Sequence, residues 1–364
     1  MKTKIMYIDD VEDELCRWKD FFEKEASANG QFEIQVMNSK NFDYEQIKRL
    51  NPDLILLDYD LSKSLNDKSL NIRGTALSTQ LREWFQDLPI ILFTKKSIFN
   101  MGQYSNIKSV LSNIDDHIYK DDVRNNNKEC FDFIMNLAEG YSRLRDSDDH
   151  SWKTLLELIK APENEQRIKL SNPPIEVSAW PVFEIVEWIR NVLLKYPGIL
   201  YDSMYSATFL GIDEKEFLSD PVQDFFLEAK YRGIFEPRNG RWWKSVLLEL
   251  ASGLIDDENS GVAIRKAFPL AWDAHIGGSI KRSVCICSEK SPAEDVCCVL
   301  REPMMIGCSL AYRADKRPPV MDESRISYKA IRTTNAYDED LFSDKGKKIL
   351  EKILASSEAK AKEC

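Results

Sequence analysis

Acidic, hydroxyl and ammonium side chains follow four short apolar runs in the first third of the chain. They are Asp9 and Asp10 after residues 4–8, Asp58 after 53–57, Thr94 after 89–93 and Lys120 after 116–119. Carboxylates are preferred ligands of a hard cation such as Mg²⁺, whereas a hydroxyl and an ammonium group suit phosphate oxygens. Brought together, these five side chains would hold a divalent cation and a phosphoryl group.

The elements between these residues predict that they do meet. Short apolar runs separated by helix-like stretches are typical of buried parallel strands. The carboxyl ends of such strands line one edge of an open sheet, and ligands bind at that edge. A further strand is expected at 33–37, and helices are expected at 11–26, 44–50, 75–85 and 130–144. This alternation predicts right-handed crossovers and a doubly wound α/β domain.

A role follows for each carboxylate. Asp10 and Asp58 are the expected direct ligands of Mg²⁺, with Asp9 binding directly or through water, and the backbone carbonyl of Asp60 offers a further oxygen. A carboxylate beside Mg²⁺ can attack a phosphoryl donor and form an acyl phosphate. The ammonium group would then offset phosphate charge, and the hydroxyl would donate a hydrogen bond to a phosphate oxygen.

With this order of residues, residues 1–145 resemble the receiver domain of two-component response regulators. The matching features are the acidic pair after the first strand, Asp58 in Pro-Asp-Leu-Ile-Leu-Leu-Asp, Thr94 and Lys120. The resemblance implies a flavodoxin-like, five-stranded parallel sheet. It also implies that Asp58 accepts a phosphoryl group from a histidine kinase or a small phosphoryl donor, that the acidic pair binds Mg²⁺, and that Thr94 and Lys120 contact the phosphate.

Four features differ from the usual receiver pattern. A polar insertion occupies residues 62–68, and Lys95 stands where a small residue is usual, so that it would crowd or electrostatically fill the phosphate site. Asp121 replaces a proline, so no cis peptide is expected there. His117 takes the aromatic switch position, where its ring can change rotamer and its charge can change near neutral pH.

The alternative to a phosphorylated receiver is a degenerate receiver that keeps its fold and partners without being phosphorylated.

Composition limits the class of protein. A chain of 364 residues predicts at least two domains, and a net charge of −10 argues against an overall basic nucleic-acid coat. The N-terminus lacks the form of a signal peptide, and no segment reaches the roughly 18 apolar residues of a membrane span. We therefore expect a cytoplasmic protein without membrane contact, whose eight cysteines are reduced or bound to metal. The resemblance to receiver domains further implies a bacterial protein.

The remainder of the chain is expected to be mainly α-helical or α+β. The predicted division is 1–145 receiver-like, 146–178 linker with a short helix, 179–260 helical and 261–364 cysteine-containing. Apolar residues at helical spacing predict helices over 152–159, from 180 to about 193, and over 200–210, 223–231, 242–254 and 345–362. We recognise no family in residues 146–364.

One segment has the alanine and glycine spacing of a helix-turn-helix. Ala207 and Gly211 lie four residues apart, but the following residues 213–220 are acidic, whereas a DNA-recognition helix needs basic or amide side chains. A packed helix with glycine at its C-cap is the preferred interpretation. The pair Trp242 and Trp243 is interpreted as core rather than as a stacking platform.

Five cysteines gather in the last third of the chain. They are Cys285, Cys287, Cys297, Cys298 and Cys308. Thiolates in a reducing compartment suit Zn²⁺, which takes four nitrogen or sulfur ligands. The spacing differs from a pair of C-x-x-C knuckles, however, and buried cysteine behaves as a small hydrophobic residue. Both interpretations stay open.

The sequence therefore predicts a response-regulator-like signalling protein rather than a metabolic enzyme, with an unassigned C-terminal effector. Three alternatives remain for that effector: a protein-interaction module, which includes self-association; a DNA-binding regulator; and an enzyme. No nucleophile–base pair, phosphate loop or metalloprotease motif occurs in residues 261–364. The interaction module is the preferred hypothesis, and nucleic acid is the less favoured partner.

Overall fold

The computed structural model of the chain describes residues 2–29, 32–61, 74–95, 113–147, 151–165, 168, 182–256, 262–334 and 337–362. The chain forms two compact units. The first consists of Met1–Leu158 and Pro174–Glu187, and the second consists of Ile159–Pro173 and Trp188–Cys364. The predicted insertion at 62–68 and part of the predicted linker lie outside the described residues, so the four-part division of the chain stays a prediction.

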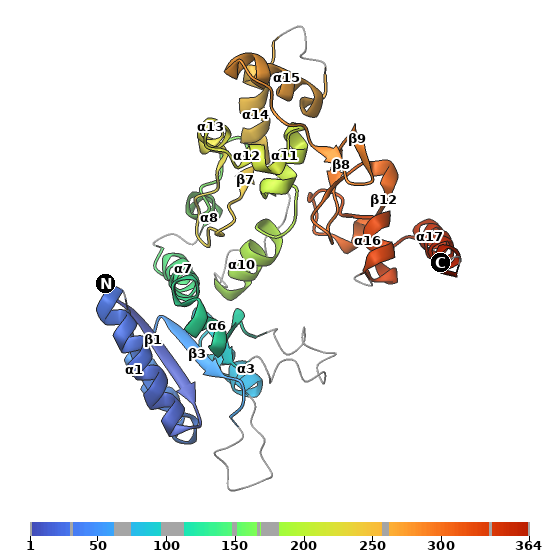
Figure 1. Cartoon of the computed structure of the whole chain (residues 1–364). Helices are drawn as coiled ribbons and strands as arrows, with labels where there is room; N and C mark the ends of the chain where they lie inside the picture. The colour runs from blue at the N-terminus through green and yellow to red at the C-terminus, as the bar shows by residue number, and fades with distance from the viewer. Residues whose placement is uncertain are drawn as a thin grey trace. The chain divides into compact units, whose positions relative to one another are not determined.

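A five-stranded parallel sheet forms the centre of the first unit (Figure 1). Its strands are β1 (Thr3–Asp9), β2 (Phe32–Asn38), β3 (Leu54–Asp58), β4 (Ile90–Thr94) and β5 (Asp116–Tyr119). The strand order is β2-β1-β3-β4-β5, which is the flavodoxin-like order of a doubly wound fold. The predicted fold class is confirmed.

Helices follow the strands along the chain of this unit. They are α1 (Glu12–Asn29), η1 (Ser39–Asn41), α2 (Tyr44–Leu50), α3 (Gly74–Trp84), α6 (Lys120–Asn125), α7 (Asn127–Arg145), α8 (Trp152–Leu158) and α10 (Val182–Trp188). α2 begins and ends at the predicted residues because both of its ends have capping residues. Asp43 accepts a hydrogen bond from the N–H of Glu45, and Asn51 ends the helix in the left-handed conformation.

The two faces of the sheet are packed differently. On one face, Trp18 of α1 lies edge-on to Phe93 of β4 with ring centroids 4.7 Å apart, and Phe131 of α7 stacks on Phe32 of β2 at 5.1 Å. The opposite face is aliphatic and packs against Ile47 of α2 and against α3. Helices on both faces bury the three central strands β1, β3 and β4, which explains the continuous apolar runs of these strands in the sequence.

Helices, short strands and turns are mixed in the second unit. It contains the π-helix η3 (Ile189–Leu193), β6 (Leu200–Tyr201), α11 (Ser203–Leu210), α12 (Glu214–Phe217), α13 (Asp220–Phe225), η4 (Leu227–Ala229), β7 (Trp242–Trp243), α14 (Lys244–Leu254), α15 (Ile264–Ile276), β8 (Val284–Cys285), β9 (Ser288–Pro292), β10 (Asp295–Val296), β11 (Pro303–Met304), η6 (Ile306–Cys308), β12 (Ser309–Ala311), η7 (Ala314–Lys316), β13 (Arg325–Ser327), α16 (Tyr328–Thr333), η8 (Glu339–Leu341) and α17 (Asp344–Lys362). Its strands pair as four two-stranded sheets.

Three predicted helices of this unit differ from the structure, two at their starts and one along its whole length. The helices predicted over 200–210 and 242–254 begin at Ser203 and Lys244, because the residues before them pair as β6 and β7. The helix predicted over 223–231 is replaced by α13 and η4. β6 and β7 are some forty residues apart in the chain, and predictions from local periodicity do not detect pairing over that distance. Both tryptophans of β7 are buried, which confirms their assignment to the core.

The packed-turn interpretation of residues 207–211 is confirmed. Gly211 caps α11 in the left-handed conformation, with φ +77°. A Cβ atom there would lie 2.0 Å from the carbonyl oxygen of Arg265, so glycine allows α11 to approach α15. The next helix, α12, has only four residues and begins at Glu214, which differs from a recognition helix that lies along a groove.

Candidate phosphoacceptor site

The register of the sheet places the predicted site residues at one edge. β1 and β3 pair Ile8 with Leu57, so that Asp9 and Asp58 come next on each strand. β4 pairs Phe93 with Asp58, and β5 pairs Tyr119 with Thr94. Thr94 and Lys120 therefore follow at the same level on the neighbouring strands. Because the strands are parallel, residues that stand at the ends of separate strands in the sequence lie together at one edge of the sheet.

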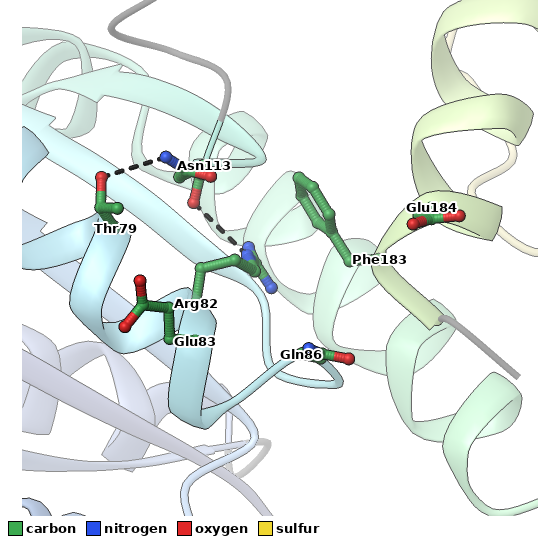
Figure 2. Close-up of a pocket in the computed structure, with 7 residues that line it drawn as sticks. All are labelled: Thr79, Arg82, Glu83, Gln86, Asn113, Phe183 and Glu184. Atoms are coloured by element: carbon green, nitrogen blue, oxygen red, sulfur yellow. Dashed lines mark hydrogen bonds between the residues drawn. The ribbon is translucent and has the colours of Figure 1, made fainter. Parts of the chain in front are cut away.

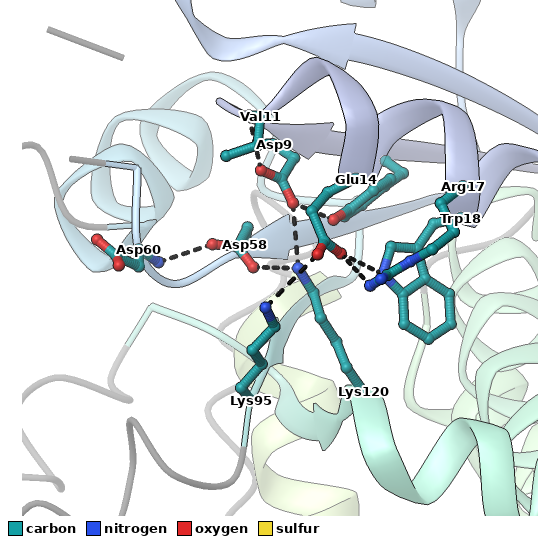
Figure 3. Close-up of polar contacts among 10 residues, drawn as sticks. Asp9, Val11, Glu14, Arg17, Trp18, Asp58, Asp60, Lys95 and Lys120 are labelled. Atoms are coloured by element: carbon teal, nitrogen blue, oxygen red, sulfur yellow. Dashed lines mark hydrogen bonds and ion pairs between the residues drawn. The ribbon is translucent and has the colours of Figure 1, made fainter. Parts of the chain in front are cut away.

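Lys120 joins two carboxylates of this cluster (Figure 3). Its ammonium nitrogen lies 2.5 Å from Asp58 Oδ1 and 3.1 Å from Asp9 Oδ2. All three side chains are buried. Buried charges persist in proteins when they are paired and hydrogen-bonded, and one cation here serves two anions.

Backbone and side-chain donors fix both carboxylates. The N–H of Asp60 donates to Asp58 Oδ2 at 2.9 Å, and the N–H of Val11 donates to Asp9 Oδ1 at 3.0 Å. The hydroxyl of Tyr7 donates a short hydrogen bond to Asp9 Oδ2. Sequence reasoning missed Tyr7, although a lone tyrosine within an aliphatic strand, two residues before the acidic pair, points to this edge. We expected the carbonyl of Asp60 as a ligand, and the structure shows its N–H bonded to Asp58.

Burial controls the acidity of the site. Burial raises the pKa of Asp58 to about 6, since the opposing attraction of Lys120 offsets it only in part and the Asp9 carboxylate adds repulsion. Burial, followed by the charges of Asp9 and Asp58, also holds the pKa of Tyr7 far above its usual range. Tyr7 is therefore a permanent hydrogen-bond donor. Asp58 changes charge close to physiological pH.

Thr94 carries a buried hydroxyl at the end of β4, the strand beside β3. Its side chain is fully buried at the end of β4, and its Oγ1 has no hydrogen-bond partner among the residues that the structure describes. A buried hydroxyl without a partner costs on the order of 1–3 kcal/mol. A phosphoryl oxygen on the neighbouring Asp58 would supply the missing acceptor.

Lys95 lies beside Glu14 of α1. Its ammonium nitrogen is 3.5 Å from Glu14 Oε1, and its side chain is about half exposed. Its predicted crowding or electrostatic filling of the phosphate site stays a prediction. Glu14 also accepts hydrogen bonds from Arg17 at 2.5 Å and from Trp18 Nε1 at 3.0 Å. Burial would raise the pKa of Glu14, but Lys120, Lys95 and Arg17 together hold it below its ordinary value. Glu14 is the second residue that sequence reasoning missed.

Two further predicted residues flank the site. Asp10 is buried directly after Asp9 at the end of β1. His117 lies on β5, about a third exposed, with Nδ1 3.6 Å from Asp116 Oδ1 and its ring edge-on to Tyr119 at 5.2 Å. Its role as a switch stays a prediction.

The donors at this edge suit Mg²⁺ in type. Asp9, Asp10 and Asp58 are buried carboxylates, and a hard cation prefers oxygen ligands. Their oxygens do not form a group within 4.8 Å of one another. Lys120 bridges Asp9 and Asp58, and their side chains would have to turn for both to bind one ion.

A shallow pocket of about 300 Å³ lies elsewhere in the first unit, beside Arg82 of α3 (Figure 2). The guanidinium group of Arg82 donates to the carbonyl of Leu88 and to Asp115 Oδ2, each at 2.8 Å, and lies 4.0 Å from the ring centroid of Phe183. Asp115 also accepts from the N–H of Ile90 at 2.8 Å. This buried pair ties α3 to β4 and β5, so we assign Arg82 to the scaffold.

The five cysteines of the second unit separate into two groups. The sulfur atoms of Cys285, Cys287 and Cys308 lie within 4.8 Å of one another. The predicted set of five is corrected, because Cys297 and Cys298 are not part of this cluster. Cys297 is fully buried in the core, where its sulfur accepts hydrogen bonds from the N–H groups of Leu300 and Ser327.

Comparison with known proteins gives matches in solved structures. No family model and no curated protein matches the chain. Among the residues that the structure describes, no helix is both long and apolar enough to cross a membrane.

The matched structures include receiver domains and response regulators. The response regulator receiver domain protein of Clostridium thermocellum is 14% identical with a TM-score of 0.29, over 38% of this chain and 94% of its own. The BeF₃-activated receiver domain of RstA from Klebsiella pneumoniae is 24% identical with a TM-score of 0.25, over 32% of this chain and 86% of its own. TrrA of Thermotoga maritima, solved in complex with Mg²⁺ and BeF, is 20% identical with a TM-score of 0.26, over 35% of this chain and 98% of its own.

Proposed function

We propose that this chain is a response-regulator-like signalling protein whose Asp58 is phosphorylated in a Mg²⁺-dependent reaction. The observation that carries the proposal is the cluster at the sheet edge. Lys120 contacts Asp58 and Asp9, and Thr94 holds a buried hydroxyl on the adjoining strand without an acceptor. A nucleophile and a cation thus meet at the edge of the sheet, and an unused hydrogen-bond donor stands at the end of the adjoining strand.

The chemistry uses residues of this chain throughout. A carboxylate oxygen of Asp58 attacks the phosphorus of a phosphohistidine on a kinase or of a small phosphoryl donor. The new P–O bond forms as the bond from phosphorus to the donor's nitrogen or oxygen breaks, and the electron pair leaves with the donor. Mg²⁺, when held by Asp9, Asp10 and Asp58, would neutralise charge on the phosphoryl oxygens. The N–H of Asp60 holds Asp58 Oδ2 and thereby orients the nucleophile.

Phosphorylation would rearrange the polar contacts of the site. The phosphoryl oxygens would accept from Lys120 and Thr94, so Lys120 would give up its direct contact with the Asp58 carboxylate. The phosphorylated and unphosphorylated sites would differ in charge and in the position of Lys120. Lys120 begins α6, directly after β5, the strand that contains His117. A shift of population between the two arrangements would change the surface around His117, and with it the association of the protein with a partner or with itself.

One observation favours a second candidate function, a degenerate receiver that acts as an interaction scaffold. Asp9 already has three donors, from Tyr7, Val11 and Lys120, and Lys95 is paired with Glu14. Asp9 and Lys95 are thus satisfied by protein groups alone. The scaffold differs from the first candidate in one measurable respect, the formation of a phosphoprotein.

The test compares the full-length protein with two variants. Each is incubated with Mg²⁺ and either acetyl phosphate or phosphoramidate, and its intact mass is measured before and after hydroxylamine, which cleaves acyl phosphates. Wild type and Asp60→Asn are expected to gain one phosphoryl group that hydroxylamine removes, whereas Asp58→Asn gains none. Asp60→Asn is the matched control because its backbone N–H, which contacts Asp58, is kept.

The outcome separates the two candidates. If wild type gains no phosphoryl group from either donor in Mg²⁺, while its far-ultraviolet circular dichroism shows a folded protein, the scaffold is supported and the proposal is wrong. EDTA is expected to abolish the reaction of wild type.

We further propose a cytoplasmic location, where a histidine kinase and the metabolic phosphoryl donors are available.

A further inference from the structure

A cluster of three cysteine sulfurs lies in the second unit. Cys285 is buried, Cys308 is half-buried and Cys287 is exposed, and their sulfur atoms are within 4.8 Å of one another. In a tetrahedral thiolate site with Zn–S bonds of about 2.3 Å, neighbouring sulfurs lie about 3.8 Å apart. An inward movement of roughly 1 Å at most would therefore bring all three into coordinating positions.

The backbone of the β8–β9 hairpin supports this arrangement. Cys285 pairs with Ser288, so Ile286 and Cys287 form the two residues of a tight turn. The N–H of Cys287 donates to Cys285 Sγ at 3.4 Å, and the N–H of Met305 donates to the same sulfur at 3.2 Å. Hydrogen bonds to sulfur favour the thiolate, which is the form that binds metal.

The third sulfur is brought in by a separate segment that is tied to the hairpin. The N–H of Ile286 donates to the carbonyl of Pro303 at 2.9 Å, and the N–H of Cys308 donates to the carbonyl of Met305 at 3.0 Å. The turn 305–308 is therefore fixed beside the hairpin by main-chain bonds. A site held in place by its backbone loses less freedom when a metal binds.

The other two cysteines of this region behave as core residues. Cys297 is fully buried, and its sulfur accepts from two backbone N–H groups. Cys298 shares a hydrogen bond with Tyr312. Free cysteine in such surroundings is a small hydrophobic residue with a weak donor. The cluster is also the only group of three potential metal-ligating side chains within 4.8 Å of one another among the described residues.

We propose that Cys285, Cys287 and Cys308 bind one Zn²⁺ through three thiolates, with the fourth position facing solvent beside Cys287. Soft thiolate ligands in close, fixed positions select Zn²⁺ over the hard cation proposed for the first unit. The strands of this region have two to five residues each, and a metal would cross-link the hairpin to the turn that follows it. The inference is independent of the proposed phosphorylation.

The test measures zinc in the full-length protein, purified with a phosphine reductant and without chelator, by inductively coupled plasma mass spectrometry. One zinc per chain is expected for wild type, for Cys298→Ser and for Cys16→Ser, whose cysteine is exposed on α1. The double variant Cys287→Ser/Cys308→Ser is expected to hold none. It spares the buried Cys285, so the fold of the unit is least disturbed.

A second measurement reports the ligands directly. After removal of zinc, Co²⁺ is expected to give intense visible bands of a tetrahedral site and a thiolate-to-cobalt charge-transfer band in wild type and in Cys298→Ser, but not in the double variant. Chelator is expected to make three further thiols of wild type reactive. Wild type that neither contains zinc nor takes up Zn²⁺ or Co²⁺ when reduced would overturn the proposal, as would a double variant that keeps its zinc. A far-ultraviolet circular dichroism spectrum that matches that of wild type reports that the double variant is folded.

Discussion

Lys120 Nζ lies 2.5 Å from Asp58 Oδ1, and both side chains are buried. The same nitrogen contacts Asp9 at 3.1 Å, so a single ammonium group compensates two carboxylates at the edge of the sheet. Such an arrangement is sensitive to any change of charge, because an unpaired charge in this position has no access to water. The contacts of Lys120 therefore affect both the stability of the first unit and the chemistry proposed for Asp58.

Removal of this cation is expected to destabilise the first unit strongly. Lys120→Gln leaves two buried carboxylates without their counter-charge, and we expect the free energy of unfolding to fall by about 3–5 kcal/mol. Lys95→Gln, which removes an exposed ion pair with Glu14, is the matched control and should cost less than about 1 kcal/mol. Urea unfolding followed by circular dichroism measures both. Equal losses in the two variants would show that the buried pair has no special role.

Replacement of the Thr94 hydroxyl is expected to separate stability from function. Thr94→Val removes a buried hydroxyl without a partner and keeps the shape, so the unphosphorylated protein should be as stable as wild type or more stable by up to about 1 kcal/mol. The phosphorylated form should lose the structural response that the phosphate contact produces. Thr94→Ser keeps the hydroxyl and is the control. Comparison of amide NMR shifts before and after phosphorylation would show the difference, and a full response in Thr94→Val would contradict the assigned role.

The raised pKa of Asp58 predicts a pH dependence with a defined sign. Burial, opposed by Lys120, puts this pKa at about 6, above the value of about 4 in an unfolded chain. The folded state therefore binds more protons between about pH 4 and 6, and this group lowers stability as the pH rises through that window. In the metal-free protein, the carboxylate of Asp58 should therefore form as the pH rises through about 6.

The carboxyl carbon resonance of Asp58, assigned with Asp58→Asn, measures this pKa directly. A midpoint near 4 would show that burial does not govern the site.

Tyr7 is expected to stabilise Asp9 through its hydroxyl alone. Tyr7→Phe keeps the ring that packs on Phe93 at 5.6 Å and removes one donor to a buried carboxylate, which should lower the free energy of unfolding by about 1.5–3 kcal/mol. Tyr44→Phe, whose ring packs on Trp84 at 4.7 Å, serves as the control and should leave stability unchanged. A neutral effect of Tyr7→Phe would show that the hydrogen bond to Asp9 is not maintained in solution.

The sheet and its edge could be predicted because the signals are local. The central strands are continuous apolar runs, and each site residue stands at the end of a strand, so parallel pairing places Asp58, Thr94 and Lys120 at one edge. The contacts of Tyr7 and Glu14 could not be predicted in the same way. They depend on which atoms meet across β1, α1 and β4, and sequence periodicity does not report that.

The second unit was less predictable for a related reason. Leu200–Tyr201 pair with Trp242–Trp243, and both segments carry apolar residues that continue the helical pattern of the residues after them. The cysteines illustrate the same limit. Spacing alone grouped five of them, and only the hairpin at Cys285 and the core position of Cys297 separate the three that cluster from those that do not.

The most direct test of the account is to locate the phosphoryl group chemically. Wild-type protein is incubated with acetyl phosphate and Mg²⁺ and then reduced with sodium borohydride, which converts an aspartyl phosphate to homoserine, and its peptides are sequenced by tandem mass spectrometry. The account predicts homoserine at position 58 and at no other aspartate, with none formed in EDTA. Homoserine at Asp9, Asp10 or Asp60 in place of Asp58, or none at all in a folded protein with Mg²⁺, would contradict it.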